Sequence, residues 1–292
     1  MSDSEELKFT GERFTPECVR EIWYEHYHRY GFAQRLVKGK QVLDAACGEG
    51  YGSDILAQVS KQVMAVDIDQ ASIKHAQKRY KRDNLEFIQA SCTQLPFADN
   101  SFEVVVSFET LEHLQQQQQM LAEFDRVLKP NGLLLISTPD KKHYSDETGF
   151  ENEYHVKELY QEEFKALLDR HWQAQQWFSQ AMMFSSMLEK IGSVEQSYAT
   201  DILDQEQIKT DKELLTSMYY VVVAAKKDTY MAVLPDLHIF ADQQQSVYNH
   251  YNQTIRDYIA VAEKYVALNN KHEKWLSTPI LGKIIKFLER GK

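Results

Sequence analysis

Three side chains that could bind a metal or move a proton lie within five residues of one another. The stretch SFETLEHL, Ser107–Leu114, contains Glu109, Glu112 and His113. In a helix these positions are i, i+3 and i+4, so they would share one face. Two carboxylates and an imidazole suit a divalent cation, because Mg²⁺ prefers oxygen ligands and Mn²⁺ tolerates nitrogen better. His155, in a polar stretch farther along the chain, could supply a fourth ligand.

Two other interpretations of this stretch stay open. His113 could act as a general base without a metal and take the proton of an attacking hydroxyl group. Acidic residues in the first turn of a helix also stabilise it through the helix dipole, which needs no ligand. If the stretch is catalytic, Glu112 and His113 are the residues expected to act on the acceptor.

A glycine-rich turn lies upstream of this stretch. The sequence DAACGEGYG begins at Asp44, and its glycines let the backbone approach a ligand closely at the start of a helix. Ala46 stands where a dinucleotide fingerprint has its first glycine. Asp67 ends the next apolar run, 23 residues after Asp44, where it can accept both hydroxyls of a ribose. The turn and this acid together predict a cofactor that carries a nucleoside.

The elements that must position these residues alternate along the chain. Short runs rich in Val, Ile and Leu predict buried strands, and amphipathic stretches between them predict helices. This order predicts a doubly wound parallel sheet, whose carboxyl edge binds ligands. Both the glycine turn and SFETLEHL follow strands at that edge. The expected strands are 41–47, 62–68, 85–91, 102–108, 132–138, 172–180 and 218–227, and the expected helices lie near 53–59, 70–81 and 115–128.

The composition limits the class of protein. Of the 292 residues 43% are hydrophobic, which is enough for a core, and the net charge of −10 argues against a nucleic-acid partner. The cysteines Cys18, Cys47 and Cys92 are widely spaced, which disfavours a disulfide framework and favours a reducing, cytoplasmic location. The acidic N-terminus does not resemble a signal peptide, and no apolar run approaches the ~20 residues that span a bilayer.

Four motifs resemble those of class I S-adenosylmethionine-dependent methyltransferases. Leu95–Val106 (LPFADNSFEVVV) is similar to their LPF-x-D-x-SFD-x-V signature, and Val127–Leu135 (VLKPNGLLL) is similar to the element before their fifth strand. Val42–Gly50 and Val66-Asp67 complete the set in the right order. The resemblance implies a Rossmann-like, doubly wound sheet of seven strands and S-adenosylmethionine as cofactor.

The resemblance also implies which residues bind that cofactor. Asp44 and the Gly48–Gly50 turn would hold its methionine part, Asp67 its ribose, and Ile68 would lie against the adenine. The family often has an aspartate at the adenine edge, where this chain has Ser91, whose hydroxyl can accept a hydrogen bond from the adenine amine. The expected cofactor-binding residues are Asp44, Ala46, Gly48, Gly50, Asp67, Ile68, Ser91 and Cys92.

A closer resemblance concerns methyltransferases encoded with glycosyltransferases in the assembly of bacterial surface polysaccharides, such as lipopolysaccharide and capsule. Gly11–Glu17, Val105–His113 and His155–Tyr160 carry it, and Trp275–Pro279 is reminiscent of polysaccharide-assembly proteins. Members of that group methylate sugar hydroxyls or cap glycan chains. The Glu-x-x-Glu-His pattern with a later histidine also resembles metal-assisted O-methyltransferases of ubiquinone synthesis and of small-RNA 3′ ends, which chelate vicinal acceptor oxygens through Mg²⁺ or Mn²⁺.

The N-terminal residues 1–36 are expected to form a helical lid on a methyltransferase domain at 37–227. They are dense in aromatics and histidines from Trp23 to Tyr30. In related enzymes such a helix folds over the cofactor, which would place positions 28–30 beside the methyl donor. Amphipathic packing on the domain explains the same pattern.

A helical extension with a basic amphipathic tail is expected at 228–292. Apolar residues at alternating steps of three and four from Tyr248 to Tyr265 predict a helical seam, for self-association as a homo-oligomer or for docking on the catalytic domain. Asn269 and His272 at the next two positions of this pattern disfavour a long coiled coil. The tail after Pro279 alternates apolar and basic residues, which suits the surface of the inner membrane, a partner groove, or packing on its own domain.

We therefore expect an S-adenosylmethionine-dependent O-methyltransferase that acts on a sugar hydroxyl of a bacterial surface glycan or its precursor, assisted by Mg²⁺ or Mn²⁺. Its acceptor would be a glycan, a sugar nucleotide or a lipid-linked sugar, and glycosyltransferases of the same pathway would be its partners. Two alternatives stay open: methylation of a small phenol- or quinone-type molecule, and a cofactor-binding scaffold subunit that transfers nothing.

Overall fold

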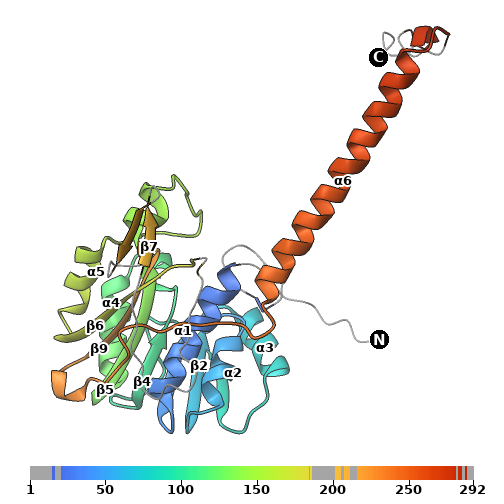
Figure 1. The fold of residues 1–292 in the computed structure, drawn as a ribbon. Helices are drawn as coiled ribbons and strands as arrows, with labels where there is room; N and C mark the ends of the chain where they lie inside the picture. The colour runs from blue at the N-terminus through green and yellow to red at the C-terminus, as the bar shows by residue number, and fades with distance from the viewer. Residues whose placement is uncertain are drawn as a thin grey trace, which may run out of the picture. The chain divides into compact units, whose positions relative to one another are not determined.

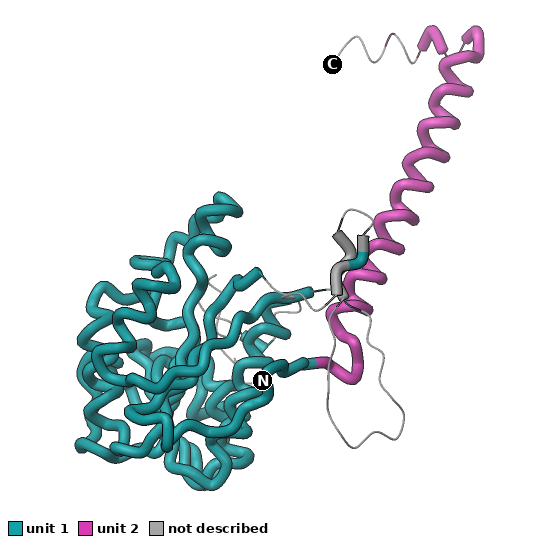
Figure 2. The backbone as a smooth tube through the Cα atoms, turned by 60° about the vertical axis from the view of Figure 1, so that its left-hand side comes forward, with its two compact units in different colours: residues 1–240 teal, residues 241–292 magenta. Residues whose placement is uncertain are grey.

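A computed structural model of the chain defines its fold. Two compact units make up the chain, residues 1–240 and residues 241–292 (Figure 2). The motif Gly11–Glu17, except for Thr15 and Pro16, and Cys18 lie outside the described residues, as does most of the basic tail. The structure describes residues 15–16, 21–183, 185, 201–204, 207–210, 216–280, 282–284 and 287.

Unit 1 is built on a seven-stranded sheet with the strand order β3-β2-β1-β4-β5-β9-β6 (Figure 1). All seven predicted strands are present, and the expected Rossmann-like architecture is confirmed. The strands are β1 (Gln41–Ala45), β2 (Gln62–Asp67), β3 (Leu85–Gln89), β4 (Phe102–Ser107), β5 (Leu128–Pro139), β6 (Ala174–Gln180) and β9 (Tyr219–Ala225).

The sheet is mixed rather than wholly parallel. Strand β9 runs antiparallel to both of its neighbours, β5 and β6, whereas the pairs among β1 to β5 are parallel. Neighbouring parallel strands need a crossover connection, usually a helix. The described part of the β6-to-β9 connection instead contains the hairpin strands β7 (Asp201–Asp204) and β8 (Gln207–Thr210).

Helices cover both faces of the sheet. Helices α1 (Glu21–Val37) and α2 (Tyr51–Ala57) pack on one face, and α4 (Gln117–Val127) and α5 (Gln161–Leu168) pack on the other. Helix α3 (Gln70–Arg79) contacts β2 and β3, and the side chain of Asp69 caps it by accepting the amides of Ala71 and Ser72. The predicted helices near 53–59, 70–81 and 115–128 correspond to α2, α3 and α4.

Helix α1 lies directly against α2 at a glycine. The Tyr30 ring covers Gly52 so closely that a Cβ atom there would lie 2.0 Å from Tyr30 Cζ. The same ring is buried and contacts Phe108 edge to face, with 5.2 Å between the centroids. The close approach of the expected lid to the cofactor turn therefore depends on the absence of a side chain at residue 52.

Gly52→Ala is expected to lower the free energy of unfolding by about 1–3 kcal/mol, because overpacking must displace the Tyr30 ring. Gly31→Ala is the matched control, since a Cβ there would meet only the Phe240 ring at 3.8 Å. That control should stabilise α1 by up to about 1 kcal/mol, the usual helix preference of alanine over glycine. Urea unfolding of both variants measures the difference, and equal stabilities would contradict the packing described.

Unit 2 contains one long helix, α6 (Ser246–Leu276). The helix expected from Tyr248 to Tyr265 is confirmed, and its role in self-association or docking stays a prediction. Among the described helices of the chain, none combines the length and the apolar character needed to cross a membrane.

Candidate functional site

The glycine turn after β1 is held in left-handed backbone conformations. Gly48 has φ +55°, Gly50 has φ +95°, and Ala46, at the position of the missing fingerprint glycine, has φ +63°. An alanine there costs roughly 1–2 kcal/mol, so the surrounding structure must fix it. Gly50 has a second constraint, because a Cβ would lie 2.8 Å from Ala76 Cβ and 2.9 Å from the Phe87 ring. The backbone conformation of the turn is therefore tightly constrained.

Glu49, between the two glycines of this turn, points away from the sheet edge. Its carboxylate is buried and binds His75 Nε2 at 2.8 Å, Tyr80 Oη at 2.7 Å and Arg79 at 3.0 Å. These contacts tie the turn to α3 and its C-terminal residue. Sequence reasoning did not single out Glu49; the signal available was a charged residue in a turn that otherwise consists of small residues.

Asp44 lies beneath the turn and is fully buried. Its carboxylate accepts hydrogen bonds from Ser53 Oγ at 2.6 Å and from the Tyr30 hydroxyl at 3.4 Å. Burial raises the pKa of Asp44 to about 7. The two hydrogen bonds lower the pKa, but burial has the larger effect. A cationic group placed beside Asp44 would restore the ionised form.

The other predicted cofactor residues line the same edge of the sheet. Asp67, at the end of β2, accepts the backbone amides of Gly48 at 2.8 Å and Asp69 at 2.9 Å. The next residue, Ile68, is 70% exposed, which is unusual for a large apolar side chain and leaves it available to a flat ring. The Ser91 hydroxyl contacts Thr93 Oγ1 at 2.8 Å.

Cys92 takes a different position from its neighbour Ser91. Its side chain is 8% exposed and packs in the core cluster on the α4 face of the sheet. Burial raises the pKa of the thiol to about 12, so it is neutral and behaves as a small apolar group. Cys92 would therefore contact an adenine ring through van der Waals packing and not through an ionised thiolate.

Cofactor affinity is expected to depend on pH through Asp44. The folded-state pKa is raised, so the protein without cofactor carries a protonated Asp44 below about pH 7. The ammonium of a bound methionine part favours the ionised form, so affinity should rise with pH by up to about tenfold per unit and level off above pH 7. Calorimetry with S-adenosylhomocysteine from pH 5.5 to 8.5 measures this slope. Asp44→Asn should flatten it, whereas Asp54→Asn on α2 should keep it.

The stretch SFETLEHL is not a continuous helix. Only Leu111–His113 is helical, as a single 3-10 turn, and Glu109 has a left-handed φ of +50°. The expected i, i+3, i+4 arrangement on one helical face is therefore wrong. Its physical cause is a tertiary contact: Ser137 Oγ, at the end of β5, accepts the Glu109 amide at 3.1 Å and donates to its carboxylate at 2.6 Å.

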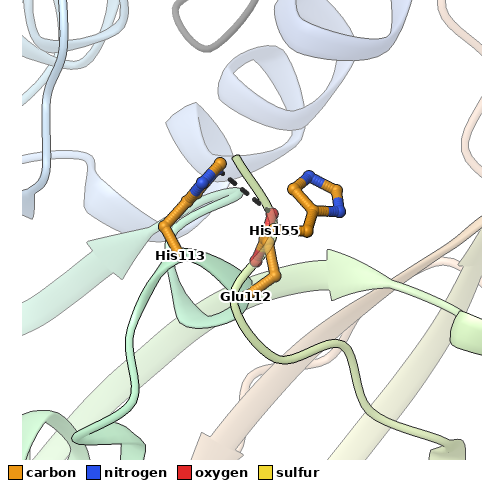
Figure 3. Close-up of side chains that lie close together, drawn as sticks. All are labelled: Glu112, His113 and His155. Carbon is orange, nitrogen blue, oxygen red and sulfur yellow. Dashed lines mark ion pairs between the residues drawn. The ribbon is translucent and has the colours of Figure 1, made fainter. Parts of the chain in front are cut away.

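Three of the four proposed ligands nevertheless converge. Ligand atoms of Glu112, His113 and His155 all lie within 4.8 Å of one another (Figure 3). His113 Nε2 lies 4.0 Å from Glu112 Oε1. Glu109 is not part of this group, because its carboxylate is turned toward Ser137.

His155 is carried to the site by backbone hydrogen bonds. The amides of Val156 and Lys157 both donate to the carbonyl oxygen of Glu112 at 2.9 Å. His155 Nδ1 then lies 2.5 Å from Glu158 Oε1, and the Tyr144 ring stacks on the imidazole with centroids 5.4 Å apart. A carboxylate on the far nitrogen is the usual second contact of a metal-binding histidine.

His113 is oriented by a backbone carbonyl. Its Nδ1 lies 2.9 Å from the Tyr154 oxygen, which can only accept, so Nδ1 carries the proton of the neutral ring. The unprotonated nitrogen is then Nε2, the atom nearest Glu112. This tautomer suits both a metal ligand and a general base.

Glu112 is the least satisfied member of the group. Its side chain is buried, Oε2 accepts the Thr138 hydroxyl at 3.1 Å, and Oε1 has no hydrogen-bond partner. Burial, followed by the nearby charge of Glu109, raises the pKa of Glu112 well above its ordinary value. A buried, unpartnered carboxylate oxygen is costly unless a cation or a proton compensates it.

A buried arginine of α1, Arg29, lies close to the carboxylate of Glu109. Its guanidinium is buried, donates from Nε to Gln180 Oε1 at 2.7 Å, and stacks 4.4 Å above the Tyr219 ring. One terminal nitrogen lies 3.7 Å from Glu109 Oε2. Sequence reasoning placed positions 28–30 near the methyl donor but gave Arg29 no role. The signal was a basic residue directly before Tyr30 on the apolar face of a helix.

The chain is similar to known methyltransferases. Residues 43–136 match the family model described as a methyltransferase domain, from β1 to β5. A probable S-adenosylmethionine-dependent methyltransferase of Mycobacterium tuberculosis is 40% identical over 167 residues, 56% of this chain and 60% of that protein. A phthiotriol/phenolphthiotriol dimycocerosates methyltransferase of the same organism is 37% identical over 108 residues, 36% of this chain and 40% of that protein. Both alignments span less than two thirds of the relatives.

A solved structure supports the fold. The YcgJ protein of Bacillus subtilis aligns with 70% of this chain and with all of its own, with a TM-score of 0.50 and 16% sequence identity. At this identity the likeness concerns the fold of unit 1 alone.

Proposed function

We propose that this protein, whose residues 43–136 match a methyltransferase domain, transfers a methyl group from S-adenosylmethionine to a sugar hydroxyl. The observation that carries the proposal is the convergence of Glu112, His113 and His155 after β4. Strand β4 neighbours β1, whose carboxyl end bears the glycine turn. The candidate donor and acceptor groups therefore share one edge of the sheet, where open α/β sheets bind ligands.

We further propose that Glu112, His113 and His155 hold a divalent cation. The residues fit one: a buried carboxylate oxygen lacks a partner, and two imidazoles lie within reach of it. One oxygen and two nitrogen ligands favour Mn²⁺ over Mg²⁺, which prefers oxygen. Such a cation, when bound, lowers the pKa of a coordinated hydroxyl.

The chain's own residues keep these three ligands in place. Thr138 holds one oxygen of Glu112, Glu158 holds the far nitrogen of His155, and a carbonyl fixes the tautomer of His113. These contacts orient the three side chains, but the Asn152 amide lies 3.0 Å from His155 Nε2 and must move before that nitrogen can bind a cation. The acceptor oxygen must then lie in line with the breaking bond to sulfur, and the hydroxyl proton must leave to a base. His113 Nε2 is placed to receive that proton if no cation is bound.

A sugar acceptor is supported by the carboxylates near the cluster, because carboxylates accept hydrogen bonds from vicinal hydroxyls. Glu109 lies near Glu112, and its side chain is 15% exposed. Glu158 is less available, because its two oxygens already bind His155 and Ser145. The resemblance to polysaccharide-assembly methyltransferases gives the same substrate class. A second candidate is a lipid- or phenol-type acceptor, favoured by the name of the phthiotriol/phenolphthiotriol dimycocerosates methyltransferase.

Transfer of labelled methyl groups tests the acceptor class. The full chain is incubated with labelled S-adenosylmethionine, with and without Mn²⁺, and with sugar nucleotides, lipid-linked sugars or catechol-type phenols. We expect label in the sugars, at an alkali-stable ether position. Label in phenols alone would establish the second candidate, and cofactor binding without transfer to any acceptor would establish a scaffold role.

The cytoplasmic location, the glycosyltransferase partners and the inner-membrane contact stay predictions. Of the tail residues expected to share an apolar face, Leu281, Ile285 and Leu288 lie outside the described residues. Ile284 is described and is 51% exposed.

A further inference from the structure

Helix α6 exposes a broad apolar surface. It runs for 31 residues, about 46 Å at 1.5 Å per residue, without a proline or glycine (Figure 2). Its central large apolar side chains are each at least half exposed, and Tyr258 and Tyr265 are 75% and 70% exposed. These central residues are Ile255, Tyr258, Ile259, Val261, Tyr265, Val266 and Leu268.

The apolar residues follow a heptad repeat over more than four turns. When Tyr248 is taken as position a, the a and d positions carry the apolar seam, and Ile259, Val261, Val266 and Leu268 occupy the flanking e and g positions. The remaining positions, b, c and f, are polar or alanine. The a and d residues are Tyr248, Tyr251, Ile255, Tyr258, Ala262, Tyr265, Asn269, His272 and Leu276.

We propose that α6 packs against the α6 helices of further copies of this chain, in parallel and in register, and so makes the protein a homo-oligomer. Most of the stability of a helix in a protein comes from the packing of its apolar face, so the exposed apolar face of α6 needs a partner. The Lys, Arg, Asp and Glu residues of α6 lie at b, c and f positions, apart from Glu273 at an e position near the end of the helix. The a and d positions therefore carry none of these charges, which would repel an identical helix.

The size of the apolar face is adequate for a stable interface. Tyrosine and tryptophan side chains bury about 150–250 Å² each, so the exposed parts of Tyr258, Tyr265 and Trp275 alone provide on the order of 400 Å². The exposed isoleucines, valines and leucine bring this face close to the ~800 Å² that each partner contributes to a standard interface. It is also larger than the apolar patch of a typical monomer, ~300–600 Å².

Asn269 selects the parallel arrangement. It occupies an a position, where an amide must find a hydrogen-bond partner when the seam is buried. In a parallel, in-register bundle Asn269 faces Asn269 of the next copy, and the two amides can bond to each other. In an antiparallel pair the a positions face d positions of the partner, so Asn269 would face a residue such as Tyr251 instead of a second Asn269, and the bond between the two amides would be lost.

The mass of the full chain in solution tests the proposal. Light scattering after gel filtration is expected to give a multiple of the 34.1 kDa chain mass at 10 µM. Ala262→Glu introduces a charge at an a position and should shift the protein to the monomer, with at least a tenfold weaker association. Ala260→Glu is the matched control: it makes the same change two residues away, on the polar side, and should leave the mass unchanged.

Several outcomes would overturn the proposal. One is a wild-type protein that is monomeric at 10 µM, whether its apolar face packs on unit 1 or binds phosphatidylglycerol vesicles. Another is an oligomer that Ala262→Glu and Ala260→Glu affect equally, since its contacts would then lie outside the seam. Methyl transfer is unaffected by either variant if α6 serves assembly alone, so these readouts are independent of the proposed activity.

Disulfide cross-linking tests the orientation. Ile255→Cys brings two thiols together only in a parallel, in-register bundle, so oxidation should join the chains. The native cysteines could also form disulfides between chains. The amount of this background cross-linking is given by the wild-type chain and by Ala260→Cys, whose new thiol lies on the polar side of the helix. A bundle that oligomerises but does not cross-link through residue 255 would disprove the parallel arrangement.

Discussion

Replacing Glu112 with glutamine is expected to lower kcat on the order of 1,000-fold at saturating Mn²⁺, within the range of acid–base and metal contributions to catalysis. The change keeps the shape of the side chain and its contact with Thr138 but removes the charged oxygen that faces the two imidazoles. EDTA should lower the wild-type rate by a similar factor, and added Mn²⁺ should restore it. In Glu112→Gln neither addition should change the residual rate.

The fold of Glu112→Gln should survive, which separates this effect from unfolding. The pKa of Glu112 is raised in the folded protein, so ionising it costs stability as the pH rises above its ordinary value of 4.5. Glutamine removes that cost, and in metal-free buffer at pH 8 the Tm should not fall. Glu162→Gln, on an exposed face of α5, is the control and should retain full activity. A wild-type enzyme indifferent to EDTA, with His113→Ala inactive, would show that His113 acts as a base without metal.

The positions of the cofactor residues follow from the sequence because they depend on local patterns. Runs such as Val104–Val106 are apolar throughout, as expected for strands buried on both faces of a sheet. Once the strands are parallel, the residues after each strand meet at one edge, which is why Asp67 and the turn beginning at Ala46 are close. The bond from Gly48 to Asp67 is a direct result of that topology.

The arrangement of the acceptor side could not be predicted, because contacts between distant residues determine it. SFETLEHL contains no glycine or proline, so the sequence gives no sign of the left-handed backbone at Glu109. That conformation depends on a contact with Ser137, 28 residues away. His155 reaches Glu112 through two backbone hydrogen bonds that leave no pattern in the sequence. The sequence places Arg29 on the apolar face of a helix, but its partners Gln180 of β6 and Tyr219 of β9 follow only from the fold.

Removing the Arg29 charge is expected to produce the largest loss of stability in unit 1. Arg29→Met keeps the length of the side chain but leaves the nearby carboxylates of Glu25 and Glu109 without their cation. Breaking a buried charge pair in this way costs about 3–5 kcal/mol. Burial raises the pKa of Glu25, and Arg29 opposes that shift. Without Arg29 the pKa of Glu25 should rise further, so the deficit in the free energy of unfolding should be larger at pH 8 than at pH 5.

A double-mutant cycle shows whether the loss comes from the charges. Glu109→Gln in the Arg29→Met background removes one stranded carboxylate and should recover part of the stability, whereas Glu109→Gln alone should be destabilising. Arg35→Met, on an exposed position of the same helix, is the matched control and should change stability by less than about 0.5 kcal/mol. If the second substitution recovers nothing, Arg29 acts through packing on Tyr219 and its hydrogen bond to Gln180 rather than through its charge.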